Sequence, residues 1–461
     1  MKVTDLNQTI AAVSTPPGKG GVALIRISGT DAFDIADTCF APRSQKKLRD
    51  YPPRTAVYGG ILYKGQQIDD GIAIAYRAPF SYTGEDMVEL CCHGGVLLTQ
   101  TVLESVLLAG AVPAEAGAFT RRAFINGKLS LRDAEAVGQL LEARSADQIK
   151  LATEQARGQV TAEVAALSES MLHLLSSVYA AIDYPEEDLA ELSRAEIVAE
   201  LGGIEARLHR LLDSYRTGHA ISEGITTVIV GRPNVGKSTL YNLLGGDDAA
   251  IVTERAGTTR DLLERTLPLG RVVLHVYDTA GIWDTGDEVE KIGIERAREK
   301  MRAAELILAV FDGSQPFTAQ DEALVSELQG MAAVKVALLN KADLRAPSTV
   351  PPYLQAFAAV LPLSAKYGDL SELTAAVDRL FTSESIKIGE NPIIATARQA
   401  AALEKARTLL QASLSAFERG FSYDVAGSDL ELALAALGEL DGLTVSQQIV
   451  DTVFARFCVG K

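Results

Sequence analysis

Residues 231–238 read GRPNVGKS, and this octapeptide limits the possible folds more than any other stretch of the chain. It matches the pattern G-x-x-x-x-G-K-[ST], in which glycines let backbone N–H groups close around phosphate oxygens at the start of a helix. A glycine-rich turn can match by chance, but here the strand-like run TTVIV precedes the pattern and the helical run TLYNLL follows it. We therefore predict a phosphate-binding loop, in which Lys237 reaches the β/γ-phosphates and Ser238 ligates Mg²⁺.

Three further segments follow in the order that a guanine-nucleotide site requires. DTAG closes a strand-like run and places Asp278 near Mg²⁺ and the Gly281 N–H near the γ-phosphate. NKAD follows the run VKVALL, and the Asp343 carboxylate can accept hydrogen bonds from guanine N1–H and the exocyclic amine, which adenine does not offer. SAK is expected to contact the same base. Each segment alone also fits a turn or helix cap, but together they predict a GTPase domain, with these motif residues at the nucleotide: Gly231, Asn234, Val235, Gly236, Lys237, Ser238, Thr239, Asp278, Thr279, Ala280, Gly281, Asn340, Lys341, Asp343, Ser364, Ala365 and Lys366.

The pattern of the whole 461-residue chain predicts a multidomain protein. Short alternating runs such as GVALIRIS and TAVYGGILY favour an α+β domain over residues 1–121. An Ala/Leu/Glu-rich pattern favours helices over 122–218, and strand-like runs alternate with helical runs over 219–385, as in a doubly wound parallel sheet. Helices resume over 386–461. We predict one all-α domain, in two parts, with an α/β domain inserted into it.

Composition limits the partners of this chain. The net charge is 44 − 60 = −16, so nucleic acid would need a local basic patch or a second protein to hold it. The segment with Arg121, Arg122, Lys128 and Arg132 is a candidate patch for RNA or for a smaller anionic ligand, and scattered surface charge is the alternative. The four cysteines have no metal-ligand spacing, and no stretch approaches a signal sequence or a span of about 18 apolar residues. We expect a cytoplasmic protein with reduced thiols and no membrane span.

The residue that orients the attacking water is left open by these motifs. Ras-like enzymes use a Gln directly after the D-x-x-G glycine, where this chain has Ile282. The loop that follows offers several carboxylates, and position alone does not choose among Asp284, Asp287, Glu288, Glu290 and Glu295.

Several stretches together are similar to the family of tRNA-modifying GTPases called MnmE (also TrmE). They are GRPNVGKSTL, AGTTRD, DTAG with DEVEKIGIER, the terminal FCVGK and, near the N-terminus, TPPGKGGVALIRISG, SYTGEDMVELCCHGG and FTRRAFINGKLSL. This resemblance extends over the whole chain. It implies that Glu290 positions the water and that K⁺ replaces an arginine finger when two G domains dimerise. The implied ligands are Asn234, Thr253, Arg255 and Thr258 for K⁺, with Thr259 joining Ser238 on Mg²⁺, and Thr253, Thr258 and Thr259 thereby join the GTP site. From the residues alone, Asn234 is better explained as a cap of the helix that follows it.

The resemblance also assigns the N-terminal domain, which the residues alone leave ambiguous. Arg26 and Glu89 each stand in an otherwise apolar strand, which usually marks a solvent face. The family has a tetrahydrofolate-binding and dimerisation domain here, which implies folate contacts for Arg26, Glu89, Lys128 and Lys461. The anionic tail of a folate is therefore the other ligand, besides RNA, for which the basic segment is a candidate. This chain departs from the family by reading AGAF at 116–119 instead of Pro-Gly-Glu-Phe, which changes the hinge before the basic segment. The vicinal pair at 91–92 is expected to be packed thiols rather than a redox pair.

The activity implied by the resemblance is modification of tRNA. A homodimeric, K⁺-stimulated GTPase works with an FAD-dependent partner, MnmG (GidA), which carries the FAD. Together they install an aminomethyl or carboxymethylaminomethyl group on C5 of the wobble uridine at position 34. The carbon comes from 5-formyl- or 5,10-methylene-tetrahydrofolate and the amine from glycine or ammonium. The alternative is a regulatory GTPase that binds ribosomes or RNA and modifies nothing, and folate binding separates the two.

The C-terminal segment is expected to form a packed amphipathic helix. Ile449, Val450, Val453, Phe454 and Phe457 recur at helical spacing, Cys458 continues the stripe, and Gly460 is suited to a left-handed cap before Lys461. Cys458 is either a buried hydrophobe or a reactive thiol, and the family places its final lysine near folate. We predict that the tail docks at the folate site of this chain or of a dimer partner, with Cys458 beside the one-carbon unit as nucleophile or acid.

Overall fold

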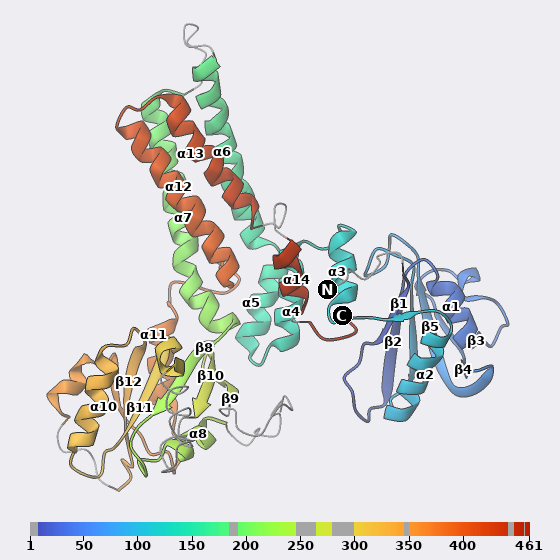
Figure 1. The fold of residues 1–461 in the computed structure, drawn as a ribbon, viewed down its shortest axis with the longest axis horizontal. Coiled ribbons are helices and arrows are strands. Elements are labelled where there is room, and N and C mark those ends of the chain that lie inside the picture. The colour runs from blue at the N-terminus through green and yellow to red at the C-terminus, as the bar shows by residue number, and fades with distance from the viewer. Residues whose placement is uncertain are drawn as a thin grey trace. The chain divides into compact units, whose positions relative to one another are not determined.

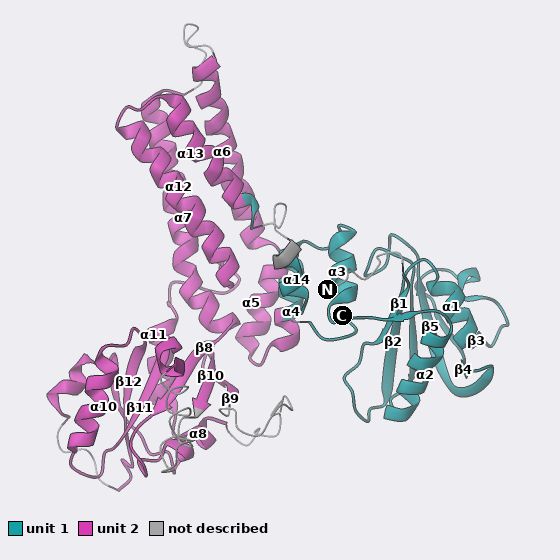
Figure 2. Ribbon diagram, viewed as in Figure 1, with its two compact units in different colours: residues 1–138, 438–461 teal, residues 139–437 magenta. Residues whose placement is uncertain are grey.

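The structure is a computed structural model of the chain and describes residues 8–183, 192–245, 264–278, 299–344, 350–440, 447–455 and 457–461. The chain divides into two compact units (Figure 2), Met1–Gly138 with Gly438–Lys461 and Gln139–Leu437. The predicted class, a multidomain chain with α+β, all-helical and inserted α/β parts, is confirmed. The predicted domain boundaries at residues 121, 218 and 385 stay predictions.

A seven-stranded sheet forms the frame of the first unit (Figure 1), in the order β3-β4-β5-β6-β2-β1-β7. The alternating runs in the sequence produce it, since Ile25 and Ile27 are buried on one face of β2 while Arg26 between them points to the other. Arg26 stands directly opposite Glu89 of β6 in the antiparallel register. The strands are β1 Ile10–Val13, β2 Val22–Ser28, β3 Phe40–Pro42, β4 Ala56–Tyr63, β5 Gln66–Tyr76, β6 Met87–His93 and β7 Val112–Pro113.

Helices cover one face of this sheet. Phe33 and Ile35 of α1 and Val102 and Val106 of α2 are buried in the same apolar core as the inward residues of β2 and β6. A second core joins the C-terminal helix α14 to α3 and α4 through Leu131, whose neighbours include the Phe454 ring. The helices are α1 Ala32–Cys39, η1 Leu48–Asp50, α2 Val96–Leu108, α3 Ala118–Ile125, α4 Leu131–Glu142 and α14 Gln447–Ala455.

Long helices form one part of the second unit (Figure 1). The helix α7 lies beside α12, which follows it by almost two hundred residues in sequence, and Arg407 Nε lies 3.1 Å from Glu205 Oε1 between them. All the α/β elements come between these two helices in sequence, so the α/β part is an insertion. The helices are α5 Ala146–Ala156, α6 Gln159–Asp183, α7 Arg194–Ser222, α12 Ala397–Glu418 and α13 Tyr423–Gly438.

One helix, α6, is long and apolar enough to cross a membrane by length and composition. The expectation that no stretch approaches such a span is therefore wrong for this helix. However, its apolar residues Val164, Leu167, Met171 and Leu174 are buried within the protein, as in the core helix of a helical bundle. The composition of α6 is thus weak support for a membrane span.

A six-stranded sheet forms the α/β part, in the order β13-β12-β11-β8-β10-β9. Five strands are parallel, as predicted, but β9 pairs antiparallel with β10, so the sheet is mixed. Pro268 in β9 is compatible with this place at the edge, because proline lacks the N–H that an interior strand must donate. The elements are β8 Ile225–Val230, α8 Lys237–Gly245, β9 Glu264–Leu269, β10 Val272–Asp278, β11 Leu306–Asp312, α10 Ala319–Gln329, β12 Val334–Asn340, η2 Pro352–Ala356, β13 Ala359–Pro362 and α11 Ser371–Phe381.

Candidate functional site

The glycine-rich loop joins the carboxyl end of β8 to the first turn of α8, as predicted. Two of its glycines have backbone angles that favour glycine, φ 155° at Gly231 and φ 101° at Gly236. A Cβ at Gly236 would lie 2.2 Å from Asn340 Nδ2, and a Cβ at Gly231 would lie 2.4 Å from the Val310 carbonyl oxygen. The loop thus needs glycine both for its conformation and for its close approach to β11 and β12.

Lys237 begins α8 and is buried, with 6% of its surface exposed. Its ammonium donates to the carbonyl oxygens of Gly231 at 2.9 Å and Arg232 at 3.0 Å, across the loop. Ser238 and Thr239 follow it in the first turn, where unpaired N–H groups and the helix dipole favour an anion. The Lys237 ammonium and the free N–H groups of this first turn together are suited to bind the phosphates of a nucleotide.

Asn340 joins three of the predicted motifs. Its Nδ2 donates to the carbonyl oxygen of Val235 at 2.7 Å, and its Oδ1 accepts from the Ala365 N–H at 2.9 Å. The side chain is 3% exposed, so these bonds are protected from water. Next to it, Ser364 Oγ donates to Asp343 Oδ1 at 2.6 Å, with the Asp343 carboxylate still exposed. Asp343 is thus available to a base, and Asn340 ties the base-reading segments to the phosphate loop.

Asp312, the last residue of β11, belongs to this cluster although sequence reasoning did not select it. Its Oδ2 accepts from Lys341 Nζ at 2.8 Å, and its Oδ1 accepts from the Ser314 hydroxyl at 2.6 Å. Burial favours the neutral acid, but these hydrogen bonds outweigh burial and lower the pKa of Asp312. The signal in the sequence was an Asp at the end of an apolar run, and in the structure this run is an all-buried strand in which Asp312 stands directly opposite Asn340. Asp312 fixes Lys341, which has a left-handed backbone at φ 65°.

Other predicted residues lie outside the described part of the chain. They include the water-positioning candidate Glu290 and the remaining ligands and motif residues Thr253, Arg255, Thr258, Thr259, Thr279, Ala280 and Gly281. The predicted K⁺ ligand Asn234 is described, and it is exposed in the loop with φ 65°. The strand β10 ends at Asp278, beside β8 and therefore at the same sheet edge as the loop.

A second polar site lies in the first unit, on the face of the sheet opposite α1 and α2. Arg26 donates to Glu89 Oε1 from Nε at 3.0 Å and from Nη2 at 2.8 Å, and both side chains are nearly buried. The guanidinium lies between two rings, 5.2 Å from the Tyr82 centroid and 5.6 Å from the Phe119 centroid. Burial, then the nearby Glu89 carboxylate, raise the pKa of Tyr76, which donates to Glu89 Oε2 at 3.2 Å. This arrangement is a nearly buried ion pair lined by aromatic rings, whose polar atoms and rings are of the kind that a polar aromatic ligand needs.

The C-terminal tail lies on this site within the same chain. Arg26 Nη1 is 3.4 Å from the Gly460 carbonyl oxygen, which also accepts from Ser14 Oγ at 2.9 Å. Val459 pairs with Ala116 in an isolated antiparallel bridge, and the Phe119 N–H donates to the Lys461 carbonyl at 3.1 Å. The structure therefore brings the backbone of the tail, at Gly460, to Arg26. Lys128 makes its hydrogen bond elsewhere, from Nζ to the Pro79 carbonyl at 3.0 Å.

The end of the chain corrects one prediction. The helix α14 ends at Ala455, and Cys458 is exposed in an extended tail instead of continuing the apolar stripe. Beyond the helix Val459 pairs with Ala116, and Cys458 and Val459 are both exposed, whereas Phe457 before them is buried. Of the two vicinal thiols, Cys92 is buried as predicted, and burial above all raises its pKa to about 11, whereas Cys91 is half-buried.

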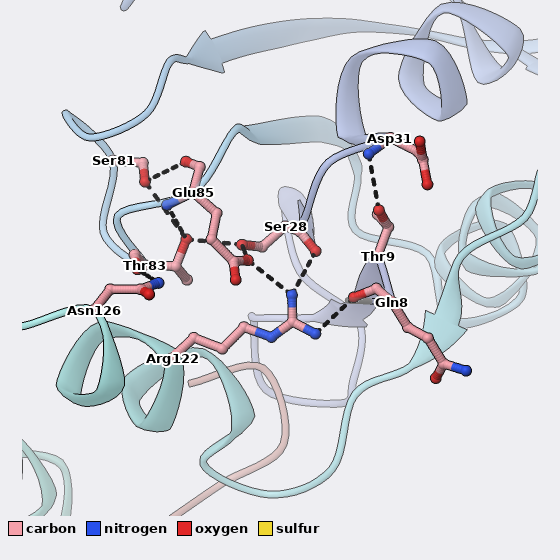
Figure 3. A network of polar contacts seen from close by, with 9 residues as sticks. All are labelled: Gln8, Thr9, Ser28, Asp31, Ser81, Thr83, Glu85, Arg122 and Asn126. Atoms are coloured by element: carbon pink, nitrogen blue, oxygen red, sulfur yellow. Dashed lines mark hydrogen bonds and ion pairs between the residues drawn. The ribbon is translucent and has the colours of Figure 1, made fainter. Parts of the chain in front are cut away.

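The basic segment 121–132 is not an exposed cationic patch. Arg122 is buried and donates to Glu85 Oε2 at 2.7 Å and to the backbone carbonyls of Ser28 and Gln8 (Figure 3). Arg132 is also buried, and Arg121 forms an ion pair with Asp451 at 2.7 Å. The patch prediction is therefore wrong, because two of its four cations stabilise the fold from within.

Comparison with known proteins covers both units. The model described as MnmE helical domain matches residues 131–458, and the one described as GTP-binding protein TrmE N-terminus matches residues 9–128. The tRNA modification GTPase MnmE of Heliobacterium modesticaldum is 40% identical over 468 residues, covering 99% of this chain and 100% of that protein. Those of Geobacillus kaustophilus and Symbiobacterium thermophilum are 38% and 39% identical, each covering 98% of this chain and 99% of the relative. With this match and this nucleotide site, the chain belongs to the tRNA modification GTPase MnmE family.

Proposed function

We propose that this GTPase, with an FAD-dependent partner (MnmG, or GidA), modifies C5 of the wobble uridine at position 34 of certain tRNAs. The added group is an aminomethyl or carboxymethylaminomethyl group, whose carbon comes from 5-formyl- or 5,10-methylene-tetrahydrofolate. The observation that carries this proposal is the similarity to the MnmE relatives over 98–99% of the chain. The similarity includes the first unit, and a protein that acted only as a GTPase would not require that unit.

In the proposed nucleotide site, Lys237 and the loop N–H groups bind the phosphates, and Asn340, Asp343 and Ser364 bind guanine. Ser238 and Thr259 would hold Mg²⁺, which supplies charge neutralisation on the phosphates when bound. Ser238 supports this role because it is exposed in the first turn of α8, beside the buried Lys237. Glu290 would orient the attacking water, since Ile282 has no polar atom that could do so.

A potassium ion is proposed as the second cation of the nucleotide site. Asn234 supports this role, because its side chain is exposed from a left-handed turn of the phosphate loop. Thr253, Arg255 and Thr258 would complete the ligand set through oxygen atoms, and a second copy of the G domain would close the site. If this is correct, GTP hydrolysis is much faster in K⁺ than in Na⁺, and equal rates in the two salts contradict it.

In the proposed folate site, Arg26, Glu89 and the tail hold the cofactor. Arg26 and the rings of Tyr82 and Phe119 support this role, because a folate has a polar fused ring that can stack and hydrogen-bond there. Lys461 and Lys128 are the proposed partners of its other polar groups. Cys458 is proposed as the reactive thiol beside the one-carbon unit, and its exposure in the tail supports access to substrate.

We propose a cytoplasmic homodimer that joins two copies of the partner in a heterotetramer, with the FAD held by the partner. GTP hydrolysis would then move domains rather than perform the carbon chemistry itself.

The experiment measures the wobble nucleoside by mass spectrometry in cells that lack the gene, with and without complementation. The wild-type gene should restore the modified nucleoside. Cys458→Ser should fail to restore it while GTP hydrolysis stays normal in the purified variant. Full modification in cells without the gene would refute the proposed function, and full modification by Cys458→Ser would remove that residue from the chemistry.

A further inference from the structure

One basic stretch of this acidic chain lies outside both sites described above. Residues 43–54 read RSQKKLRDYPPR, which gives 5 − 1 = +4, whereas the whole chain carries −16. The stretch connects β3 to β4 and includes η1. All five of its lysine and arginine side chains are exposed, in contrast to the buried arginines of 121–132.

Residues 77–80, which follow β5, lie beside this stretch and are hydrogen-bonded to cations. Arg77 Nη2 donates to the Arg49 carbonyl at 2.6 Å, and Arg54 Nη2 donates to the Phe80 carbonyl at 3.3 Å. Lys128, the proposed folate contact, donates to the carbonyl of the residue before Phe80 at 3.0 Å. Cations from three separate segments thus meet around one short loop, and one of them also belongs to the proposed folate site.

Phe80 stands among these cations with 66% of its surface exposed. The Arg54 guanidinium lies 5.7 Å from the centroid of its ring, within reach of a cation–π interaction. A single exposed apolar side chain is common on protein surfaces, and the cations that surround Phe80 are what distinguish this one. Single-stranded RNA is bound by this combination, with bases stacked on an aromatic ring and phosphates held by neighbouring cations.

Nearby carboxylates reduce this positive charge only in part. Arg49 pairs with Asp34 at 2.9 Å, and both side chains are exposed. Lys46 and Lys47 have no ion-pair partner within the part of the chain that the structure describes. At physiological salt, charges more than about 8 Å away are largely screened, so the −16 of the whole chain does not cancel a local cluster.

We propose that Phe80, Arg54, Arg77, Lys46 and Lys47, named here the Phe80 surface, bind single-stranded RNA. An unpaired base stacks on the Phe80 ring, and the cations hold the phosphates on either side. This inference rests on the proposed function, because the anticodon loop of a tRNA supplies unpaired bases that must come close to the folate site. Lys128 connects the two places through its hydrogen bond to Pro79.

The test measures binding of a short hairpin RNA, with an unmodified uridine in its loop, to the full-length chain by fluorescence anisotropy. Phe80→Ala should weaken binding about 5- to 140-fold, the range for loss of one base stack, and Phe80→Trp should restore it. The matched control is Phe421→Ala, which removes an aromatic side chain of similar exposure (51%) from the second unit. It should leave binding unchanged.

Salt dependence tests the cations separately. Removing a cation that neutralises one phosphate of a single strand should lower the slope of log affinity against log salt by about 0.7, so Arg54→Ala with Arg77→Ala should lower it by about 1.4. Arg210→Ala, at an exposed arginine of α7, is the control and should leave the slope unchanged.

Several outcomes would overturn the inference. The first is that Phe80→Ala binds the hairpin as tightly as the wild type. The second is that the wild type binds a polyglutamate peptide instead of RNA. The third is that the Phe80, Arg54 and Arg77 variants lose binding of 5-formyltetrahydrofolate but keep RNA binding. The last two would assign the surface to an acidic protein or to the anionic tail of folate. Because the proposed function is tested on the wobble nucleoside in cells, normal modification together with unchanged hairpin binding refutes this surface alone.

Discussion

His219, near the end of α7, makes the stability of the second unit depend on pH. Its Nδ1 lies 3.0 Å from Glu223 Oε2, and its Nε2 lies 3.0 Å from Glu305 Oε1. Glu305 in turn accepts from the Thr226 N–H of β8 at 2.9 Å, so the imidazole ties the long helix to the α/β sheet. Hydrogen bonds to Glu223, then to Glu305, raise the pKa of His219 to about 9 from its ordinary 6.5, against the opposing effect of burial. The Tyr215 ring also packs on it, with centroids 5.4 Å apart.

The size of the effect follows from this shift. A group whose pKa is higher in the folded state stabilises the protein fully below its unfolded pKa, and the contribution is lost as pH rises through the folded pKa. Here the window runs from 6.5 to about 9. At about 1.36 kcal/mol for each pKa unit, the upper limit is about 3.4 kcal/mol. The Glu305 side chain is 38% exposed, so water screens the pair, and we expect ~1–2 kcal/mol.

Amide hydrogen exchange of α7 and β8, followed by mass spectrometry at several urea concentrations, reports on the second unit alone. Between pH 6.5 and 9.5, the wild type should lose ~1–2 kcal/mol more opening free energy than His219→Gln, which does not titrate. His209→Gln is the control, since His209 lies 3.6 Å from Asp213 and both side chains are more than half exposed. A folded pKa near 6.5 for His219 by NMR, or the same loss in His219→Gln, would refute the reasoning.

Three further predictions concern the nucleotide site. Gly236→Ala should weaken GTP binding by ~10- to 100-fold and leave folate binding unchanged, because its Cβ would meet the Asn340 amide at 2.2 Å; equal GTP affinity by calorimetry would show that the loop relaxes freely. Glu290→Ala should lower GTP hydrolysis by roughly 10²–10⁴ with GTP binding nearly intact, and a normal turnover rate would exclude this residue as the water-positioning group. Asp343→Asn should shift preference from GTP to xanthosine triphosphate, whose C2 carbonyl accepts from the new amide; competition binding that still favours GTP would contradict base reading by this residue.

The nucleotide loop could be predicted from the sequence because its residues have fixed backbone requirements. Gly231 and Gly236 adopt positive φ where a side chain would collide with β11 or Asn340, so few other residues would do. The parallel strands that end at the loop were also predictable, since continuous apolar runs such as VALL of β12 are typical of strands that are buried on both faces. At this site the sequence motif and the contacts between distant strands require the same residues.

Asp312 and β9 could not be predicted with the same methods. The role of Asp312 depends on its register beside Asn340, which brings the carboxylate to Lys341 29 residues away. The segment of β9 contains Pro268, which disfavours a strand unless the strand lies at an edge. The partners of Arg122 likewise come from distant segments, since Glu85 and Gln8 reach it only in the folded sheet. Residue type thus identified charges, but only the fold decided which of them are exposed.

At the last residues of the chain, one feature was predictable from the sequence and its structural cause was not. The sequence indicated a positive φ at Gly460, and the structure has φ 96° there, but the cause is not the end of a helix. A Cβ at this position would lie 2.3 Å from the Val13 carbonyl oxygen, so glycine is needed for the tail to lie against β1. Gly117 has the same requirement on the other side of the contact, where a Cβ would lie 2.5 Å from the Phe454 carbonyl oxygen. Two glycines far apart in sequence thus let the C-terminus approach Arg26, and Cys458 is exposed two residues before the Gly460 carbonyl that Arg26 contacts.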